Sequence, residues 1–123
     1  MKELTKAEEQ IMQVLWDLKQ AFVKDVIAQL PKPKPATTTV STIIRILESK
    51  GFVDHEAFGS THRYFPIVSL ESYKEFATGK LLNSYFGNSV EQMFSFFLKK
   101  EKVDLKEADQ ILQLIEELKK KQK

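Results

Sequence analysis

The stretch TTTVSTIIRILESKG, residues 37–51, places an apolar row and a row of small hydroxyl side chains on opposite sides of one predicted helix. Successive residues of a helix lie about 100° apart, which puts four apolar side chains in one narrow sector. These residues are Val40, Ile43, Ile44 and Leu47. We expect this row to pack on a core, and a helix over residues 37–50 to end at Gly51, because glycine best accepts a left-handed C-terminal cap.

The opposite face of this predicted helix carries hydroxyl groups and a single arginine. Its residues are Thr38, Thr42, Arg45 and Ser49, flanked by Thr39 and Ser41. Short side chains let a helix enter a DNA groove, hydroxyls contact phosphates or base edges, and arginine suits the acceptors of guanine. An ordinary solvated face favours Glu and Lys instead. We therefore interpret these six residues as a DNA-binding face rather than as a threonine-capped surface helix.

A basic, proline-rich connector precedes this helix. Its sequence, PKPKP over residues 31–35, is incompatible with a helix or a central strand. Lys32 and Lys34 are expected to contact phosphates by their charge and position, with solvated side chains as the alternative.

The segment after the helix, residues 52–66, predicts a β-hairpin in which two β-compatible runs flank a Gly-Ser turn. This hairpin would form a wing beside the DNA-binding face, with His62 and Arg63 just after the turn. Two interpretations stay open for Arg63: contact with the DNA backbone, or a cross-strand ion pair with Asp54 or Glu56.

Two helices are predicted before the connector. Thr5 and Glu8 form a capping-box pattern at the start of an amphipathic helix over residues 4–18, on which Trp16 is expected to anchor the helix to the rest of the domain. A second, short helix over residues 23–30 ends at a proline. Three helices followed by a hairpin are the layout of a winged helix-turn-helix.

The C-terminal half contains three predicted helices rich in phenylalanine and leucine. Three short helices cannot bury this much apolar surface alone, which favours a homodimer over helices that fold back on the winged domain. The expected dimerisation residues are Phe94, Phe97, Leu98, Ile111, Leu112, Ile115 and Leu118. The predicted fold is thus mainly α with a small β-hairpin wing: a winged helix-turn-helix DNA-binding domain over residues 1–68 and a helical dimerisation region over residues 69–123.

Composition narrows the class of protein. The chain has 123 residues, a net charge of +2 and no cysteine, which excludes disulfides, thiol nucleophiles and thiolate metal sites. Without a signal peptide or a long apolar run, a cytoplasmic protein that does not insert into a membrane is expected. The only histidines, His55 and His62, lie on the predicted hairpin without a clustered arrangement of carboxylates. We therefore predict no enzyme, no cofactor and no metal site.

Three stretches together resemble the penicillinase-repressor family of winged-helix regulators: LTKAEEQIMQVLW, VKDVIAQL and TTTVSTIIRILESKGFVDHEAFGSTHRYFPIVS. The resemblance covers residues 4–69 by motif and the C-terminal half by layout. It implies a homodimeric repressor on a palindromic operator, with the helix over 37–50 in the major groove and the wing over 52–66 on the DNA backbone. It also implies a membrane sensor or protease pathway as inducer.

The chain departs from this family in two places. The tryptophan that often precedes the recognition helix is replaced here by the sequence KPAT, residues 34–37. Ser95-Phe96 stands where the family's protease-sensitive Asn-Phe bond is expected, and the cysteine motifs of copper-responsive members are missing. The prediction is a DNA-binding transcriptional repressor whose operator and inducer have no readable signature. The alternative is a winged-helix module that binds another protein, for which Ile46 is the candidate apolar anchor.

Overall fold

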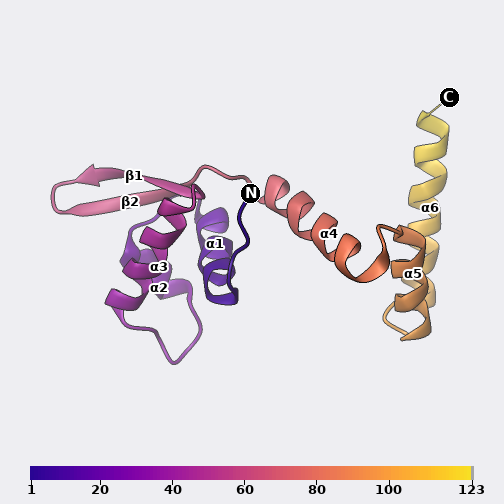
Figure 1. The fold of residues 1–123 in the computed structure, drawn as a ribbon, viewed down its shortest axis with the longest axis horizontal. Coiled ribbons are helices and arrows are strands. Elements are labelled where there is room, and N and C mark those ends of the chain that lie inside the picture. The colour runs from indigo at the N-terminus through magenta and orange to yellow at the C-terminus, as the bar shows by residue number, and fades with distance from the viewer. Residues whose placement is uncertain (123) are drawn as a thin grey trace. The chain divides into compact units, whose positions relative to one another are not determined.

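The computed structural model describes residues 1–122, in which six helices and one two-stranded antiparallel hairpin are found (Figure 1). In chain order the elements are α1 Lys6–Leu18, α2 Val23–Gln29, α3 Thr37–Ser49, β1 Val53–Phe58, β2 Thr61–Pro66, α4 Leu70–Phe86, α5 Val90–Lys99 and α6 Leu105–Lys121. The chain divides into two compact units, Met1–Phe76 and Ala77–Lys123. The mainly α fold with a hairpin wing is therefore confirmed.

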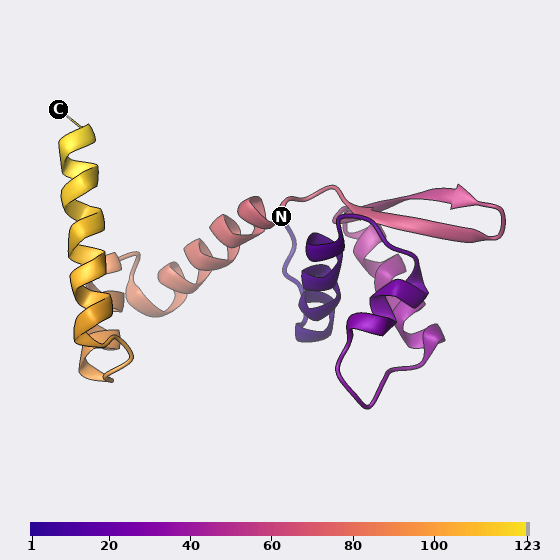
Figure 2. The same ribbon diagram turned by 180° about the vertical axis from the view of Figure 1, so that it is seen from behind.

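The N-terminal unit packs α1, α2 and α3 around one apolar core. Figures 1 and 2 show these helices gathered together, with the hairpin projecting from them. The predicted buried row of α3 supplies much of this core: Val40, Ile44 and Leu47 are inaccessible to solvent, and Ile43 is half-buried. Burying a Leu, Ile or Val side chain contributes about 1.5–3 kcal/mol each, which offsets the weak helix propensity of a threonine-rich segment.

The ends of α3 agree only partly with prediction. Gly51 has a φ of +84°, the left-handed conformation expected just after the helix. At the other end, however, the N-cap is Ala36, whose side chain cannot accept a hydrogen bond, and Thr37 is already helical. No threonine side chain therefore caps the start of this helix, and packing of the apolar row carries its stability instead.

The hairpin is held to the helices by a β-bridge between Ala21 and Tyr64. His55 lies opposite Tyr64, Glu56 opposite Arg63, and the turn falls at Gly59 and Ser60. The N–H of Tyr64 donates to the carbonyl of Ala21 at 2.8 Å, and the N–H of Ala21 returns a bond of 2.9 Å. The wing is thereby fixed to the connection between α1 and α2.

A buried ion pair links α1 to the end of α3. The predicted capping box is present: the N–H of Thr5 donates to Oε1 of Glu8 at 2.8 Å, and the N–H of Glu8 donates back at 3.2 Å. Glu8 is only 5% exposed, and Nζ of Lys50 lies 2.7 Å from the same Oε1. Burial alone would raise the pKa of Glu8, but the hydrogen bonds and charge of Lys50 and the Thr5 N–H lower it below its ordinary value.

The start of α4 is anchored on α1. Nε1 of Trp16 donates to the carbonyl of Val68 at 2.9 Å, which confirms the anchoring role expected of that tryptophan. The ring of Tyr73 lies against Trp16 and Phe52, and its hydroxyl donates to Glu9 at 2.6 Å. Burial and this carboxylate raise the pKa of Tyr73 to about 12.

The C-terminal unit combines the rest of α4 with α5 and α6. Ser89 and Asp104 cap α5 and α6 through hydrogen bonds from the N–H groups of Gln92 and Glu107. No described residue of α5 or α6 is buried. No helix within residues 1–122 has the length and apolar character that crossing a membrane requires.

Candidate nucleic-acid interface

The predicted DNA-binding face of α3 is free of the protein core. Thr38, Thr39, Thr42, Arg45 and Ser49 are exposed, and Ser41 is half-buried on the side that faces the wing. Ile46, the apolar residue next to them, is 41% exposed. The structure thus brings all six residues onto one accessible side of a single helix.

Thr42 presents only part of its hydroxyl chemistry to a partner. Its Oγ1 donates to the carbonyl of Thr38 at 2.8 Å, one turn earlier in α3. The hydroxyl hydrogen is therefore committed within the helix, whereas the methyl group and the remaining oxygen lone pair stay outward. In this rotamer Thr42 can contact a thymine methyl or accept from a base amino group, but it cannot donate to a phosphate.

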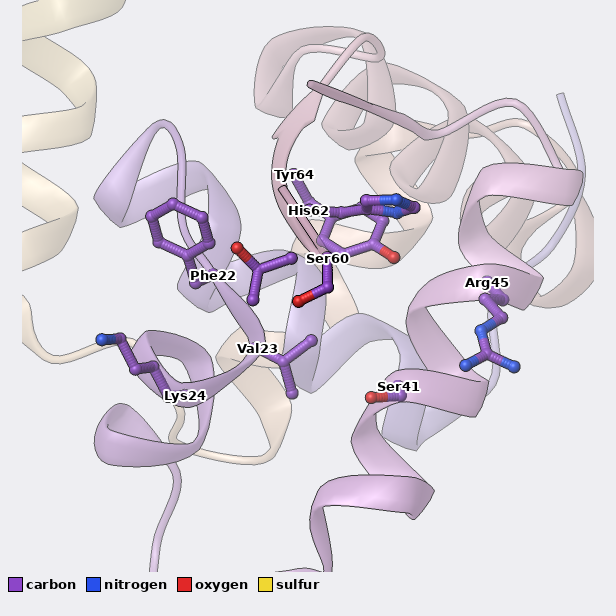
Figure 3. Close-up of a pocket in the computed structure, with 9 residues that line it drawn as sticks. Phe22, Val23, Lys24, Ser41, Arg45, Ser60, His62 and Tyr64 are labelled. Carbon is purple, nitrogen blue, oxygen red and sulfur yellow. The ribbon is translucent and has the colours of Figure 1, made fainter. Parts of the chain in front are cut away.

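A cleft of about 460 Å³ separates α3 from the wing (Figure 3). Ser41 and Arg45 border it on α3, and Ser60, Thr61, His62 and Tyr64 border it on the hairpin. Burial raises the pKa of Tyr64, the charge of Glu48 raises it further, and Arg45 acts in the opposite direction. Two predicted DNA-binding elements therefore share the walls of one concave surface.

The third wall of this cleft was not predicted from the sequence. It consists of Phe22, Val23 and Lys24, at the start of α2 (Figure 3). Lys24 is exposed there and adds a second cation to the one supplied by Arg45. A lysine in the first turn of a short helix does not by itself indicate a DNA contact. Lys24 comes to the cleft only because the connector between α2 and α3 lets the two helices pack together.

Arg63 is engaged within the hairpin. Its guanidinium lies 3.0 Å from Oε1 of Glu56, the cross-strand partner, and 4.7 Å from the centre of the Phe58 ring. The cross-strand ion pair, one of the two open interpretations, is the one found. Nε of Arg63 is buried without an acceptor among the described residues, so the side chain is held by one terminal nitrogen on Glu56 and by the Phe58 ring.

The two lysines of the connector differ in their surroundings. Nζ of Lys34 donates to the carbonyls of Ile27 and Ala28 at 3.0 Å each and to that of Leu30 at 2.5 Å. These are carbonyls at the C-terminal end of α2, where a positive charge offsets the helix dipole. Lys34 thus has a structural role in this state, whereas Lys32 is exposed.

The histidines of the wing are not isolated, contrary to the expectation that no carboxylates gather around them. The rings of His55 and His62 are stacked, with centres 4.0 Å apart and planes 7° apart. Nδ1 of His55 lies 2.5 Å from Oε2 of Glu48, near the end of α3, and 3.9 Å from Oδ1 of Asp54. Glu48 precedes His55 by seven positions, across the end of α3, so the turn between α3 and β1 brings the two side chains together.

The family model described as penicillinase repressor matches residues 4–117 of the chain. A penicillinase repressor from Bacillus licheniformis is 25% identical over 122 residues, which cover 98% of this chain and 95% of that protein. The methicillin resistance regulatory protein MecI of Staphylococcus aureus (strain N315) is 22% identical over 92% of this chain and 93% of its own. The solution structure of the DNA-binding domain of the repressor BlaI matches 59% of this chain and 94% of that domain, with 27% identity and a TM-score of 0.51.

Proposed function

Because the chain belongs to the penicillinase repressor family, we propose that it is a DNA-binding transcriptional repressor that acts as a homodimer on a two-fold symmetric operator. One relative is named a penicillinase repressor and another a methicillin resistance regulatory protein, and the matching solved domain is the DNA-binding domain of a repressor. The proposed place of action is the cytoplasm, where the DNA of a bacterium lies. The family consists of repressors, so no catalytic role is assigned to the chain.

The exposed face of α3 beside the wing cleft carries this proposal. Thr38, Thr39, Ser41, Thr42 and Ser49 are small enough to let α3 lie deep in a major groove, and Arg45 extends from the same face. Across the cleft, His62 and the backbone of Gly59 and Ser60 would meet the adjacent phosphates. Lys32 adds a charge before the helix.

Structural contacts rank the remaining cations. Lys24 at the cleft is the additional phosphate contact that we propose. Arg63 would have to leave Glu56, and Lys34 would have to leave three carbonyls, before either could bind a phosphate. Both are therefore expected to contribute less to DNA affinity than Arg45.

Fluorescence anisotropy tests operator binding, with a labelled duplex from the chain's own promoter and a random duplex of equal length. We expect the promoter duplex to bind more tightly at every salt concentration, with log affinity falling linearly with log salt. Arg45→Ala should weaken promoter binding by about 1–3 kcal/mol, roughly 5- to 150-fold, if the arginine reads a base pair. Lys6→Gln on α1, which is exposed and outside the cleft, is the charge-matched control. Equal affinity for both duplexes would end the proposal.

The apolar surface of the C-terminal unit supports the homodimer. A groove of about 470 Å³ between α5 and α6 is lined by four of the expected dimerisation residues: Phe94, Ile111, Leu112 and Ile115. Leu98 and Leu118 are 46% and 52% exposed, and Phe97 is half-buried. An apolar groove together with further exposed apolar side chains favours burial against a second copy.

Sedimentation velocity tests the dimer in the full chain. Phe94→Glu should shift the protein to monomers, because it places a charge in the apolar groove. Gln92→Glu adds the same carboxylate to α5 outside that groove and should leave the dimer intact. A wild-type chain that stays monomeric at micromolar concentration, or a Phe94→Glu chain that stays dimeric, contradicts this part of the proposal.

The proposal also includes a membrane sensor or protease pathway as inducer, as the family resemblance implies. The Ser95–Phe96 bond lies inside α5, and Ser95 is half-buried. A protease would need to unwind α5 to reach this bond, because cleavage requires an extended substrate. Incubating cells with a β-lactam and following the chain by immunoblot would test it, with an intact band arguing against cleavage.

A further inference from the structure

The junction between α3 and β1 gathers three side chains whose ligand atoms suit a metal ion. Glu48 comes from the last turn of α3, and Asp54 and His55 come from the start of β1. Their ligand atoms all lie within 4.8 Å of one another. The geometry points to a site for one divalent transition-metal ion of the Zn²⁺ class, held by Glu48, Asp54 and His55 at the base of the wing.

The imidazole of His55 is oriented before any ion arrives. Stacking against His62, with ring centres 4.0 Å apart, and contact with Tyr64 at 5.7 Å fix the plane of the ring. Its Nδ1 is directed at Oε2 of Glu48, 2.5 Å away. The backbone N–H of His55 also donates to Oδ1 of Asp54 at 2.8 Å, which curls that carboxylate toward the same ring. A nitrogen ligand so placed loses little freedom on binding.

The charge of the cluster favours a cation. Two carboxylates share one imidazole, and within residues 1–122 their only ion-pair partner is His55. The side chains of Glu48 and His55 are each 31% exposed, and that of Asp54 is 61% exposed. The cluster therefore offers two carboxylate groups and one imidazole to a cation, with a solvent side from which an ion can enter and where water can complete its coordination.

The ligand set selects the class of ion. An imidazole nitrogen with two carboxylate oxygens suits Zn²⁺, Co²⁺ or Ni²⁺, whereas Ca²⁺ and Mg²⁺ prefer oxygen alone and Cu⁺ prefers sulfur. Ligand atoms about 2.1 Å from a tetrahedral Zn²⁺ lie roughly 3.4 Å apart. The 2.5 Å contact of His55 with Glu48 must widen and the 3.9 Å separation from Asp54 must shrink, which small side-chain rotations accomplish.

Such an ion would fasten the wing to the recognition helix. Glu48 lies one turn after Arg45 on α3, and His55 stacks on His62, which borders the wing cleft. Metal binding would then stabilise the arrangement of α3 and β1 that the proposed function requires. The metal site itself does not rest on that function.

Isothermal titration of the tag-free full chain with ZnCl₂, and with CoCl₂ followed by visible absorption, tests the site without DNA. We expect one ion per chain, because the cluster offers a single set of three ligands. His55→Gln, Glu48→Gln and Asp54→Asn should each weaken binding by about tenfold or more, because each removes one of three protein ligands. Glu56→Gln, the next carboxylate along β1 but outside the cluster, should bind as the wild type does.

The inference is overturned if neither Zn²⁺ nor Co²⁺ binds, or if His55→Gln binds the ion with the same affinity as the wild type. Circular dichroism of each variant separates a lost ligand from a lost fold. In the anisotropy assay, added Zn²⁺ should change promoter affinity in the wild type but not in His55→Gln. If the metal binds and the promoter does not, the site stands and the proposed function fails.

Discussion

Replacing Lys50 with methionine would leave the carboxylate of Glu8 buried without its counter-ion. Methionine keeps most of the apolar stem of lysine, so the change removes the charge and hydrogen bonds with little loss of packing. In the wild type, Nζ of Lys50 lies 2.7 Å from Oε1 of Glu8 and donates to the carbonyl of Glu3 at 3.2 Å. The variant carboxylate retains only the bonds of its capping box.

The size of the effect follows from the burial of the two partners. Removing one member of a fully buried ion pair costs about 3–5 kcal/mol, because the other charge remains desolvated. The Glu8 side chain is 6% exposed, but that of Lys50 is 23% exposed, so water can partly replace the ammonium. We expect Lys50→Met to lower the free energy of unfolding by about 2–3 kcal/mol at pH 7.

The pH dependence distinguishes electrostatics from packing. The pKa of Glu8 is lowered in the folded wild type, so its contribution to stability is present above its ordinary value of 4.5 and is lost as pH falls below it. In the variant, burial and the hydrogen bonds of Thr5 remain while the lowering by Lys50 is gone, so the pKa of Glu8 should be higher than in the wild type. The difference in stability between wild type and variant should therefore shrink as pH falls from 7 toward 4.

Urea unfolding followed by the fluorescence of Trp16, the only tryptophan, measures this difference in the N-terminal unit. Glu8→Gln and the double variant complete a thermodynamic cycle for the pair. A loss below about 0.5 kcal/mol at pH 7, the range of ordinary surface substitutions, would refute the reasoning. So would a loss that is the same at pH 4.

Three further substitutions test the effect of glycine conformation on stability and the loss of stability at alkaline pH. Gly51→Ala should lower the free energy of unfolding in urea by about 1–2 kcal/mol, because φ is +84° there although no atom lies near the added Cβ. Gly79→Ala is the matched control, because Gly79 lies inside α4 and has no positive φ. This variant should instead stabilise α4 by about 1 kcal/mol. Tyr73→Phe should cost about 1 kcal/mol at pH 7 through the lost bond to Glu9. The pKa of Tyr73 is raised from 10.0 to about 12, so the stability that this group contributes is complete below pH 10 and is lost as pH rises through 12. If the free energy of unfolding of Tyr73→Phe falls with pH as steeply as that of the wild type, this assignment is contradicted.

Much of the N-terminal unit was predictable because its signals are local. The apolar row of α3, the Thr5–Glu8 capping box and the Gly-Ser turn each depend on residues within one or two turns of chain. Spacing of this kind decides which side of a helix is buried before any partner is known. The exposed face of α3 follows directly, as the side that the core does not use.

Contacts between distant residues were beyond these signals. Lys34 was interpreted as a phosphate contact by its charge, but the path of the connector brings its ammonium to the end of α2. Arg63 had two open partners, and the register of the hairpin placed Glu56 opposite it. The sequence shows that a lysine or arginine is charged but does not identify its partner, because the long side chain reaches whichever acceptor the fold brings near.

The sequence by itself determined the elements, their order and the side of α3 left free, since helical and strand periodicity are properties of neighbouring residues. Tertiary structure alone decided which charges are paired. It brought Glu8 to Lys50, 42 positions away, and Glu48 to His55 across the end of α3. It also formed the cleft in which Lys24, Arg45 and His62 face one space. The physical reason is that the free energy of a charge depends on its surroundings in three dimensions, whereas the pattern of apolar residues is already complete along the chain.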